Sequence, residues 1–387
     1  MLTQIRISGF KAIKDSGLVQ LGPLTLLIGR NGSGKSSLVE ALQWLQGAVF
    51  QGLRESTLSR FAKFDGLVNR TCDETSIRLF FRSEESRTTR YGFTVKPFEQ
   101  GLLVQTESCS EATSKMPFAK PIIQSKRLSN GSVVRSIKGG NPVRDNDALA
   151  LASVTKTKAL GAERLLEFLR SAVFLRLSPT AMALPGRLLP RTRGPALDEE
   201  GREIVALLNQ LNAAQRANVA KAVAQVIGGV EDISVVSEVA EGYYQTHERM
   251  RTPSGTQVFP VPSWMLSEGT RRITAIFALL AMEPKPSLIA IEEIENGLDP
   301  WTLQFVLRAL REASNDGVQV LLTTHSPFLL DHVDIDEVIH VRRNKGDTEY
   351  QPITTFDDVV KNQGVVAPGA MYIAGYMQDA EDSDASA

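Results

Sequence analysis

The feature of the sequence that most restricts the fold is a glycine-rich segment at residues 29–36, GRNGSGKS. It matches the pattern GxxxxGKS/T, which is specific when a buried strand precedes it and a helix follows it. Residues 24–28 form a nearly continuous apolar run, as expected for a strand buried on both faces, and the apolar residues that follow the segment fall on one face of a helix. The segment is therefore predicted to be a phosphate-binding loop in an α/β fold.

Glycines in such a loop let backbone N–H groups turn inward around phosphate groups, and the positive end of the helix dipole adds to the attraction. Lys35 is expected to reach the β- and γ-phosphates of a bound nucleotide, and the hydroxyl group of Ser36 to ligate Mg²⁺. The residues predicted to hold the nucleotide are Gly29, Asn31, Gly32, Ser33, Gly34, Lys35, Ser36 and Ser37.

A second apolar strand, predicted at residues 288–291, ends in two adjacent carboxylates, Glu292 and Glu293. In open α/β sheets, ligands bind at the carboxyl ends of the strands. Glu292 is expected to hold Mg²⁺ directly or through water, and Glu293 to orient or deprotonate the attacking water. Glu292 stands where many such sites have the shorter aspartate, so contact through water and slower chemistry are both compatible with the sequence.

A helix is predicted to begin within residues 266–272, LSEGTRR. Ser267 suits the N-cap position of that helix. A helix N-terminus opened by Ser267 and Gly269 is also a second device for binding phosphate. Each chain is therefore expected to carry two phosphate-binding elements.

Two further segments follow along the chain, ENGLDP at residues 295–300 and TTHS at residues 323–326. Taken in this order, the motifs resemble those of ABC-like ATPases of the RecF/SMC/OLD branch, and most closely those of prokaryotic OLD-type AAA family ATPases that lack a Toprim nuclease domain. The resemblance is specific over residues 1–45 and 255–345 and weak between them. It implies an α/β fold, namely a P-loop NTPase with an ABC-type split nucleotide-binding domain plus an inserted β and α-helical region.

The resemblance also implies ligands and roles. In this family the signature segment of one subunit, here residues 266–272, closes over the P-loop nucleotide of the other. ATP and Mg²⁺ are thus the expected ligands, and an ATP-dependent homodimer is the expected assembly. The implied catalytic residues are Lys35, Glu293 and His325, with His325 at the γ-phosphate, and the further nucleotide contacts are Ser267, Gly269 and Asp299.

The motifs divide the chain into an N-terminal ATPase lobe at 1–70, an inserted region at 71–250, a C-terminal ATPase lobe at 251–345 and an extension with an acidic tail at 346–387. Within the insertion we expect short antiparallel strands over 71–110, a loop or partly disordered segment over 110–160 and helices over 161–228. Strands again alternate with helices from residue 262, with helices predicted at 270–281 and 301–313, which favours a parallel sheet.

Several family features are missing or open. No heptad pattern persists, so the chain is not expected to be an SMC arm protein. No Toprim-like acidic cluster follows His325, so the nuclease of OLD proteins is expected to be absent or supplied by a separate chain. Gln100 and Gln105 are the candidates for the Q-loop glutamine, and Lys11 and Lys14 are the candidates for the adenine contact.

The net charge of −1 hides an uneven distribution. Residues 51–195 carry 24 Lys and Arg against 13 Asp and Glu, whereas the remainder carries 19 against 31. The basic middle could neutralise DNA phosphates, although a solvated basic surface explains it equally well. The candidate residues are Lys120, Lys126, Arg127, Arg135, Lys138, Arg144, Arg187, Arg191 and Arg193.

Cys72 and Cys109 are too few for a disulfide framework and are expected to be reduced thiols. No hydrophobic leader is evident, and the longest apolar run, residues 273–282, falls short of the roughly 20 residues of a membrane helix. A cytoplasmic protein without direct membrane insertion is expected.

Three functions are compatible with these motifs. The leading hypothesis is an ATPase whose ATP-closed dimer is a switch or platform in prokaryotic antiphage defence or nucleic-acid surveillance, with a separately encoded effector, for which a nuclease is expected. The alternative is a RecF-like DNA-repair clamp that binds duplex DNA. A less favoured alternative is the ATPase subunit of a transporter.

Overall fold

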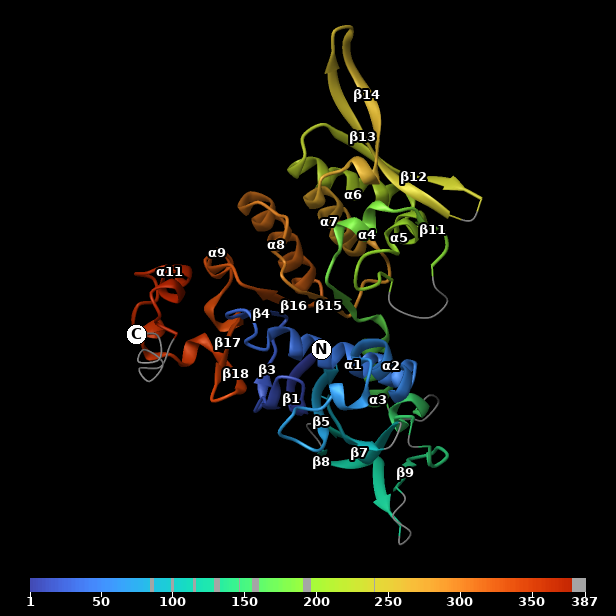
Figure 1. The fold of residues 1–387 in the computed structure, drawn as a ribbon, viewed down its shortest axis with the longest axis vertical. Helices are drawn as coiled ribbons and strands as arrows, with labels where there is room; N and C mark the ends of the chain where they lie inside the picture. The colour runs from blue at the N-terminus through green and yellow to red at the C-terminus, as the bar shows by residue number, and fades with distance from the viewer. Residues whose placement is uncertain are drawn as a thin grey trace. The chain divides into compact units, whose positions relative to one another are not determined.

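The computed structural model describes residues 1–83, 87–98, 101–113, 116–128, 133–145, 147–154, 160–190, 196–239 and 241–377 (Figure 1). It contains two compact units. Unit 1 comprises Met1–Arg170 and Thr323–Ala387, and unit 2 comprises Ser171–Leu322. Neither cut coincides with a boundary expected from the sequence, so the four-part division above stays a prediction.

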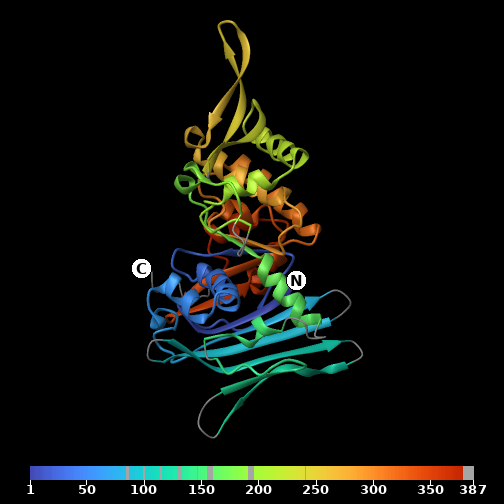
Figure 2. The ribbon, with the colours of Figure 1, turned by 90° about the vertical axis from the view of Figure 1, so that its right-hand side faces the viewer.

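A large antiparallel sheet dominates unit 1. Its strand order is β2-β1-β5-β6-β7-β8-β9, with β3 paired to β1. Figure 2 shows its long strands side by side, coloured from blue to green. The strands are β1 (Leu2–Phe10), β2 (Ile13–Asp15), β3 (Val19–Gln20), β5 (Thr75–Ser83), β6 (Arg87–Phe98), β7 (Gly101–Thr113), β8 (Met116–Arg127) and β9 (Val133–Ile137).

The expectation of a loop over residues 110–160 was wrong. Strands β7, β8 and β9 carry the sheet through most of this stretch, and η2 (Ala150–Ser153) follows them. The buried residues Ile123 and Ile137 are each followed there by an exposed polar residue. Because a strand with one solvated face needs an apolar residue only at every second position, its composition resembles that of a loop.

The buried face of the sheet packs on helices. Helix α1 (Lys35–Phe50) places Trp44 against Phe10 and Phe93, with ring centroids 6.2 and 5.9 Å away. Helix α3 (Leu160–Ser171) places Phe168 5.2 Å from the Phe81 ring centroid. Helix α2 (Leu53–Phe61) and η1 (Phe64–Gly66) follow α1.

A smaller group of strands in unit 1 supports the glycine-rich loop. Strand β4 (Leu24–Ile28) pairs in parallel with β17 (Val338–Asn344), which forms an antiparallel hairpin with β18 (Asp347–Pro352). Short helices complete this unit, namely α9 (Pro327–Leu330), η4 (Ile335–Glu337), η5 (Ile353–Thr355), α10 (Asp357–Lys361) and α11 (Pro368–Ile373).

Unit 2 has a parallel core. Strand β15 (Leu288–Ile291) lies between β10 (Val173–Leu175) and β16 (Gln319–Thr324) and is parallel to both. Its long helices α7 (Glu268–Ala281) and α8 (Pro300–Asn315) include the predicted helical ranges. Strand β10 was not predicted, because three buried residues are too few to show a period.

A second layer of unit 2 holds further helices and a sheet in which β13 pairs with β11, β12 and β14. The elements are α4 (Pro179–Ala183), β11 (Gly186–Arg187), α5 (Ile204–Gln210), α6 (Ala213–Val226), β12 (Val230–Glu238), β13 (Glu241–Thr252), β14 (Gly255–Pro262) and η3 (Ser263–Met265). Among the described residues of both units, no helix has the length and apolar character needed to span a bilayer.

Candidate functional site

The glycine-rich segment forms the predicted turn between β4 and α1. Gly32 and Gly34 have φ angles of 75° and 109°, which side-chain-bearing residues rarely adopt. Gly29 is needed for a different reason, since a Cβ atom there would lie 2.0 Å from the carbonyl oxygen of Val341. The three glycines thus allow a compact loop pressed against β17.

The loop has polar groups suited to a phosphate. Lys35 is only 5% exposed, and its Nζ donates hydrogen bonds to the carbonyl oxygens of Gly29 and Arg30 at 2.7 and 3.0 Å. The buried hydroxyl of Ser33 has no hydrogen-bond partner among the described residues. Helix α1 begins without a side-chain cap and without an acidic residue in its first turn. An orphaned buried hydroxyl, an uncapped helix N-terminus and a buried lysine fit an anionic phosphate.

The structure brings His325 to this loop within unit 1. Its Nδ1 lies 3.1 Å from Nζ of Lys35 and 3.1 Å from the carbonyl oxygen of Gly29. Nδ1 can accept from the lysine or donate to the carbonyl, depending on the tautomer. Two predicted catalytic residues that are 290 positions apart in sequence are therefore in direct contact.

The two adjacent glutamates lie in unit 2 at the end of β15. Glu292 is 5% exposed, and its backbone N–H donates to the carbonyl oxygen of Leu175 at 2.8 Å. Glu293 has a φ angle of 49°, and its carboxylate accepts a hydrogen bond from Nδ2 of Asn296 at 2.6 Å. A positive φ at a residue with a side chain is strained, and such strain concentrates at functional positions.

The segment that resembles the family signature opens α7. Oγ of Ser267 accepts a hydrogen bond from the Thr270 backbone N–H at 3.1 Å and so caps the helix. A Cβ atom at Gly269 would lie 2.8 Å from the carbonyl oxygen of Gly297. Segments 266–272 and 295–300 are therefore packed together.

Arg272 belongs to the same cluster. Burial lowers the pKa of its guanidinium group, and the nearby carboxylates of Glu268 and Glu293 oppose that shift. The signature helix thus contributes a positive charge beside the strained glutamate.

Asp299 has a local structural role that the sequence did not predict. Its Oδ1 accepts hydrogen bonds from the backbone N–H groups of Trp301 and Thr302 at 3.0 and 3.1 Å, so it caps α8. Hydrogen bonds from Thr302, through its side chain and its backbone, lower the pKa of Asp299. Its contact with nucleotide stays a prediction.

Other sequence candidates have different partners. Lys11 forms an ion pair with Glu40 and lies 5.5 Å from the ring centroid of Phe61. Lys14 is exposed. Gln105 lies in β7 and accepts a hydrogen bond from Arg127. Gln100, and the 378–387 part of the acidic tail, lie outside the described residues.

The basic residues suggested for DNA binding differ in their exposure to solvent. Arg135 cannot bind DNA as suggested, because it is fully buried and its Nε lies 3.6 Å from the carboxylate of Glu107. Lys126, Lys138, Arg144 and Arg187 are exposed. Arg191 and Arg193 lie outside the described residues, as does the side chain of Lys120.

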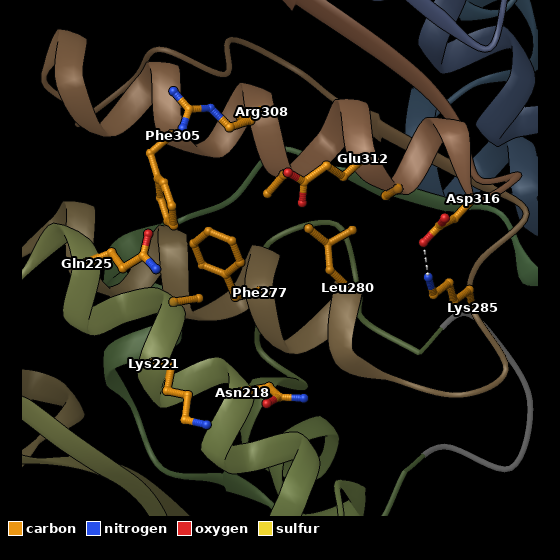
Figure 3. A pocket seen from close by; sticks show the side chains of 13 residues that line it. Asn218, Lys221, Gln225, Phe277, Leu280, Lys285, Phe305, Arg308, Glu312 and Asp316 are labelled. Carbon is orange, nitrogen blue, oxygen red and sulfur yellow. Dashed lines mark hydrogen bonds and ion pairs between the residues drawn. The ribbon is translucent and has the colours of Figure 1, made fainter.

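A groove in unit 2 lies apart from these motifs. It has a volume of about 490 Å³ between α6, α7 and α8, with Phe277, Phe305 and Leu280 among its lining residues (Figure 3). None of the predicted site residues lines it.

Comparison with known proteins identifies the family. Residues 24–331 match the family model described as "AAA domain, putative AbiEii toxin, Type IV TA system". The chain belongs to this family.

Three proteins are similar to this chain in sequence. An OLD nuclease from Thermus scotoductus is 24% identical over 362 residues, which cover 90% of this chain and 63% of the relative. The chain thus spans less than two thirds of that protein. A chromosome partition protein Smc from Coxiella burnetii is 34% identical over 89 residues, or 22% of this chain and 8% of that protein. An energy-coupling factor transporter ATP-binding protein from Mycoplasmopsis synoviae is 33% identical over 96 residues, or 24% of this chain and 29% of that protein.

The fold is similar to that of a solved Smc head bound to the C-winged helix domain of ScpA. The TM-score is 0.53 at 13% identity, covering 90% of this chain and 96% of that one. The family match, the similarity to an OLD nuclease and this fold together support an ABC-like ATPase of the OLD/SMC type, so the predicted family and the predicted fold class are confirmed.

Proposed function

We propose that this ABC-like ATPase binds ATP at the glycine-rich loop and hydrolyses it. The observation that carries the proposal is the cluster of Lys35, His325 and the Gly29 carbonyl around a loop with an orphaned Ser33 hydroxyl. The Lys35 ammonium donates to the neutral carbonyl oxygens of Gly29 and Arg30, and a phosphate oxygen would offer it a stronger, charge-assisted acceptor.

The reacting groups follow from the family motifs. Ser36 and Glu292 would hold Mg²⁺, which prefers oxygen ligands and uses one or two carboxylates together with substrate phosphates. When bound, this ion neutralises charge on the β- and γ-phosphates. Glu293 is the proposed base that accepts a proton from the attacking water, and His325 is the proposed contact to the γ-phosphate.

We also propose that two copies close over two ATP molecules. The N-terminus of a helix attracts phosphate groups, and Ser267, the N-cap of α7, is exposed. In the proposed dimer, Ser267, Gly269 and Asp299 face the nucleotide of the partner.

The proposed role of this dimer is a switch or platform in antiphage defence or nucleic-acid surveillance. Its support is the similarity to a protein named OLD nuclease, of which this chain matches only part, and a family description that names a toxin. The proposal therefore includes a separately encoded effector, with a nuclease as the expected kind.

The deciding experiment is the mass of the Glu293→Gln protein in solution, with and without Mg²⁺-ATP. Loss of the proposed base should slow hydrolysis about 10²- to 10⁴-fold, trap the closed state and double the mass when ATP is added. Glu283→Gln changes an exposed glutamate just before β15 and should behave as wild type. A Glu293→Gln protein that binds ATP but keeps a single mass would exclude the ATP-dependent dimer.

Duplex DNA binding is a second candidate function, favoured by the solvent face of the large sheet. Arg78, Arg82, Arg90, Lys96 and Lys126 are exposed on strands β5, β6 and β8. The strand registers place Arg78 opposite Gly92, and Gly92 opposite Ser108, while the guanidinium of Arg90 lies 5.6 Å from the ring centroid of Phe80. At the outward positions of β5–β9 whose side chains the structure describes, no carboxylate offsets these charges.

Such a face suits a phosphate backbone, whose binding is electrostatic and weakens with salt. A variant carrying Arg78→Ala, Arg82→Ala and Arg90→Ala should bind a short duplex at least about tenfold more weakly and show a smaller salt dependence. Lys221→Ala with Arg308→Ala, on α6 and α8, is the matched control. Equal binding by both variants would reject this face as the DNA site.

A further inference from the structure

A hairpin at residues 338–352 forms one wall of the glycine-rich loop. Strand β17 presents the carbonyl oxygen of Val341 to Gly29, and β18 presents Thr348 to Gly34. A Cβ atom at Gly34 would lie 2.5 Å from both Oγ1 and Cγ2 of Thr348. In Figure 1 this hairpin, in red, lies in unit 1 with the blue N-terminal strands.

The hairpin is itself anchored. Nη1 of Arg343 and Oγ1 of Thr348 both donate hydrogen bonds to the carbonyl oxygen of Ala12, at 2.7 and 3.0 Å. The carboxylate of Asp347 accepts from the Lys14 backbone N–H at 2.7 Å. Three side chains within six residues thus tie the hairpin to β2 and to the turn that precedes it, so the hairpin is a fixed support for the loop.

A hydrogen bond connects this support to the loop. The hydroxyl of Tyr350 donates a hydrogen bond to the carbonyl oxygen of Gly34 at 2.8 Å. Burial raises the pKa of this phenol well above its ordinary value, so it remains a neutral donor. Gly34 is the N-cap of α1, and its carbonyl also accepts from the Ser37 backbone N–H at 3.1 Å.

The peptide bond that follows Gly34 makes this contact matter for ligand binding. A trans peptide is planar, so its C=O and N–H point in opposite directions. Holding the Gly34 carbonyl against Tyr350 therefore sets the direction of the Lys35 N–H, one of the first N–H groups of α1. Gly34 has a φ angle of 109°, and glycine can adopt many other backbone conformations. A contact from outside the loop therefore helps to hold its peptide group in one orientation.

We propose that Tyr350 is a positioning residue for nucleotide, which orients the Gly34–Lys35 peptide toward the phosphates through its hydroxyl. The proposal rests on the proposed ATP-binding function of the loop. It predicts an effect on nucleotide affinity rather than on the hydrolytic step.

The test compares Tyr350→Phe with wild type in three measurements: the Kd values for ATP and ADP, kcat and KM, and the unfolding temperature without nucleotide. Loss of one hydrogen bond should raise both Kd values and KM about 3- to 10-fold and change kcat less than about twofold. Tyr244→Phe is the matched control, because the Tyr244 hydroxyl is buried and has no hydrogen-bond partner among the described residues. It should leave Kd unchanged.

A rescue variant separates positioning from packing. Replacement of Tyr350 by 4-aminophenylalanine keeps a donor at the same place and should restore Kd to within about twofold of wild type. The 4-aminophenylalanine variant also tests the proposal if Tyr350→Phe does not fold. Unchanged Kd in Tyr350→Phe, or no restoration by the aniline, would overturn the proposal. Absence of nucleotide binding by the wild type would instead overturn the proposed function itself.

Discussion

Nζ of Lys35 lies 3.1 Å from Nδ1 of His325, so the lysine of the glycine-rich loop and the histidine after β16 form one polar cluster. The Gly29 carbonyl oxygen contacts both side chains. We expect this arrangement to couple nucleotide binding to the histidine, because a phosphate that attracts Lys35 would remove one neighbour of His325.

Replacement of His325 should separate binding from turnover. In His325→Ala the loop and Lys35 remain, so we expect kcat for ATP hydrolysis to fall about 10²-fold or more while the Kd for ATP changes less than about threefold. His247→Ala, in β13, is the control and should keep wild-type turnover. Steady-state kinetics together with equilibrium binding would decide, and unchanged kcat in His325→Ala would remove His325 from the mechanism.

A methyl group at Gly269 should block dimer closure without affecting the loop of its own chain. The Cβ atom would lie 2.8 Å from the Gly297 carbonyl oxygen, so one of the two packed segments must shift. We expect Gly269→Ala to lose at least about tenfold in ATP turnover, as expected for a misplaced phosphate contact, and to keep the wild-type Kd for ATP in the monomer. At Gly228 a Cβ atom would meet nothing within 4 Å, so Gly228→Ala is the control. A Gly269→Ala protein with full activity would show that the signature segment tolerates the shift.

The buried pair in the large sheet should determine the stability of unit 1. Glu107 and Arg135 are both 0% exposed, and Glu107 also accepts the backbone N–H groups of Ala150 and Leu151 at 2.7 and 2.9 Å. Glu107→Ala leaves a buried guanidinium without its ion-pair partner and two amides without their acceptor, so we expect a loss of about 3–5 kcal/mol in unfolding free energy. Denaturant unfolding followed by the fluorescence of buried Trp44 would measure it, with exposed Glu74→Ala as the control. A loss below about 1 kcal/mol would mean that the pair contributes little.

The N-cap at Asp299 should stabilise unit 2 by an amount that is constant near neutral pH and falls only in acid. Asp299→Ala removes the acceptor for two N–H groups of α8, which costs about 1 kcal/mol. Because hydrogen bonds lower the pKa of Asp299 in the folded state, this contribution is fully present above the ordinary pKa of about 3.9 and is lost as pH falls through the lower folded value. The difference in Tm between wild type and variant should therefore be constant from pH 8 to pH 5, the interval in which Asp299 is ionised in both states. A difference that shrinks within that interval would contradict the assigned pKa direction.

Local patterns in the sequence predicted much of the fold and motif set. The apolar runs at 24–28 and 288–291 coincide with β4 and β15, and α7 and α8 contain the predicted helices. These predictions succeed because burial on both faces and helical periodicity are written in neighbouring residues. Glycine positions in the loop were equally evident, since positive φ angles at Gly32 and Gly34 depend on the residue itself.

Strands in which apolar and polar residues alternate were harder to predict from the sequence. Strands β8 and β9 were missed because each needs apolar residues on one face only, and that face becomes recognisable when the strands pair. Arg135 looked like an available surface cation, yet its burial depends on Glu107, which belongs to a neighbouring part of the sheet.

The sequence by itself thus determined which residues could form a phosphate-binding loop, a capped signature helix and an acidic strand end. Only the tertiary structure decided that His325 contacts Lys35 and that Tyr350 holds the Gly34 carbonyl across 316 residues. The physical reason is that helix periodicity, capping and backbone freedom are properties of adjacent residues, whereas a hydrogen bond between distant segments exists only after strand pairing has placed both partners in one unit.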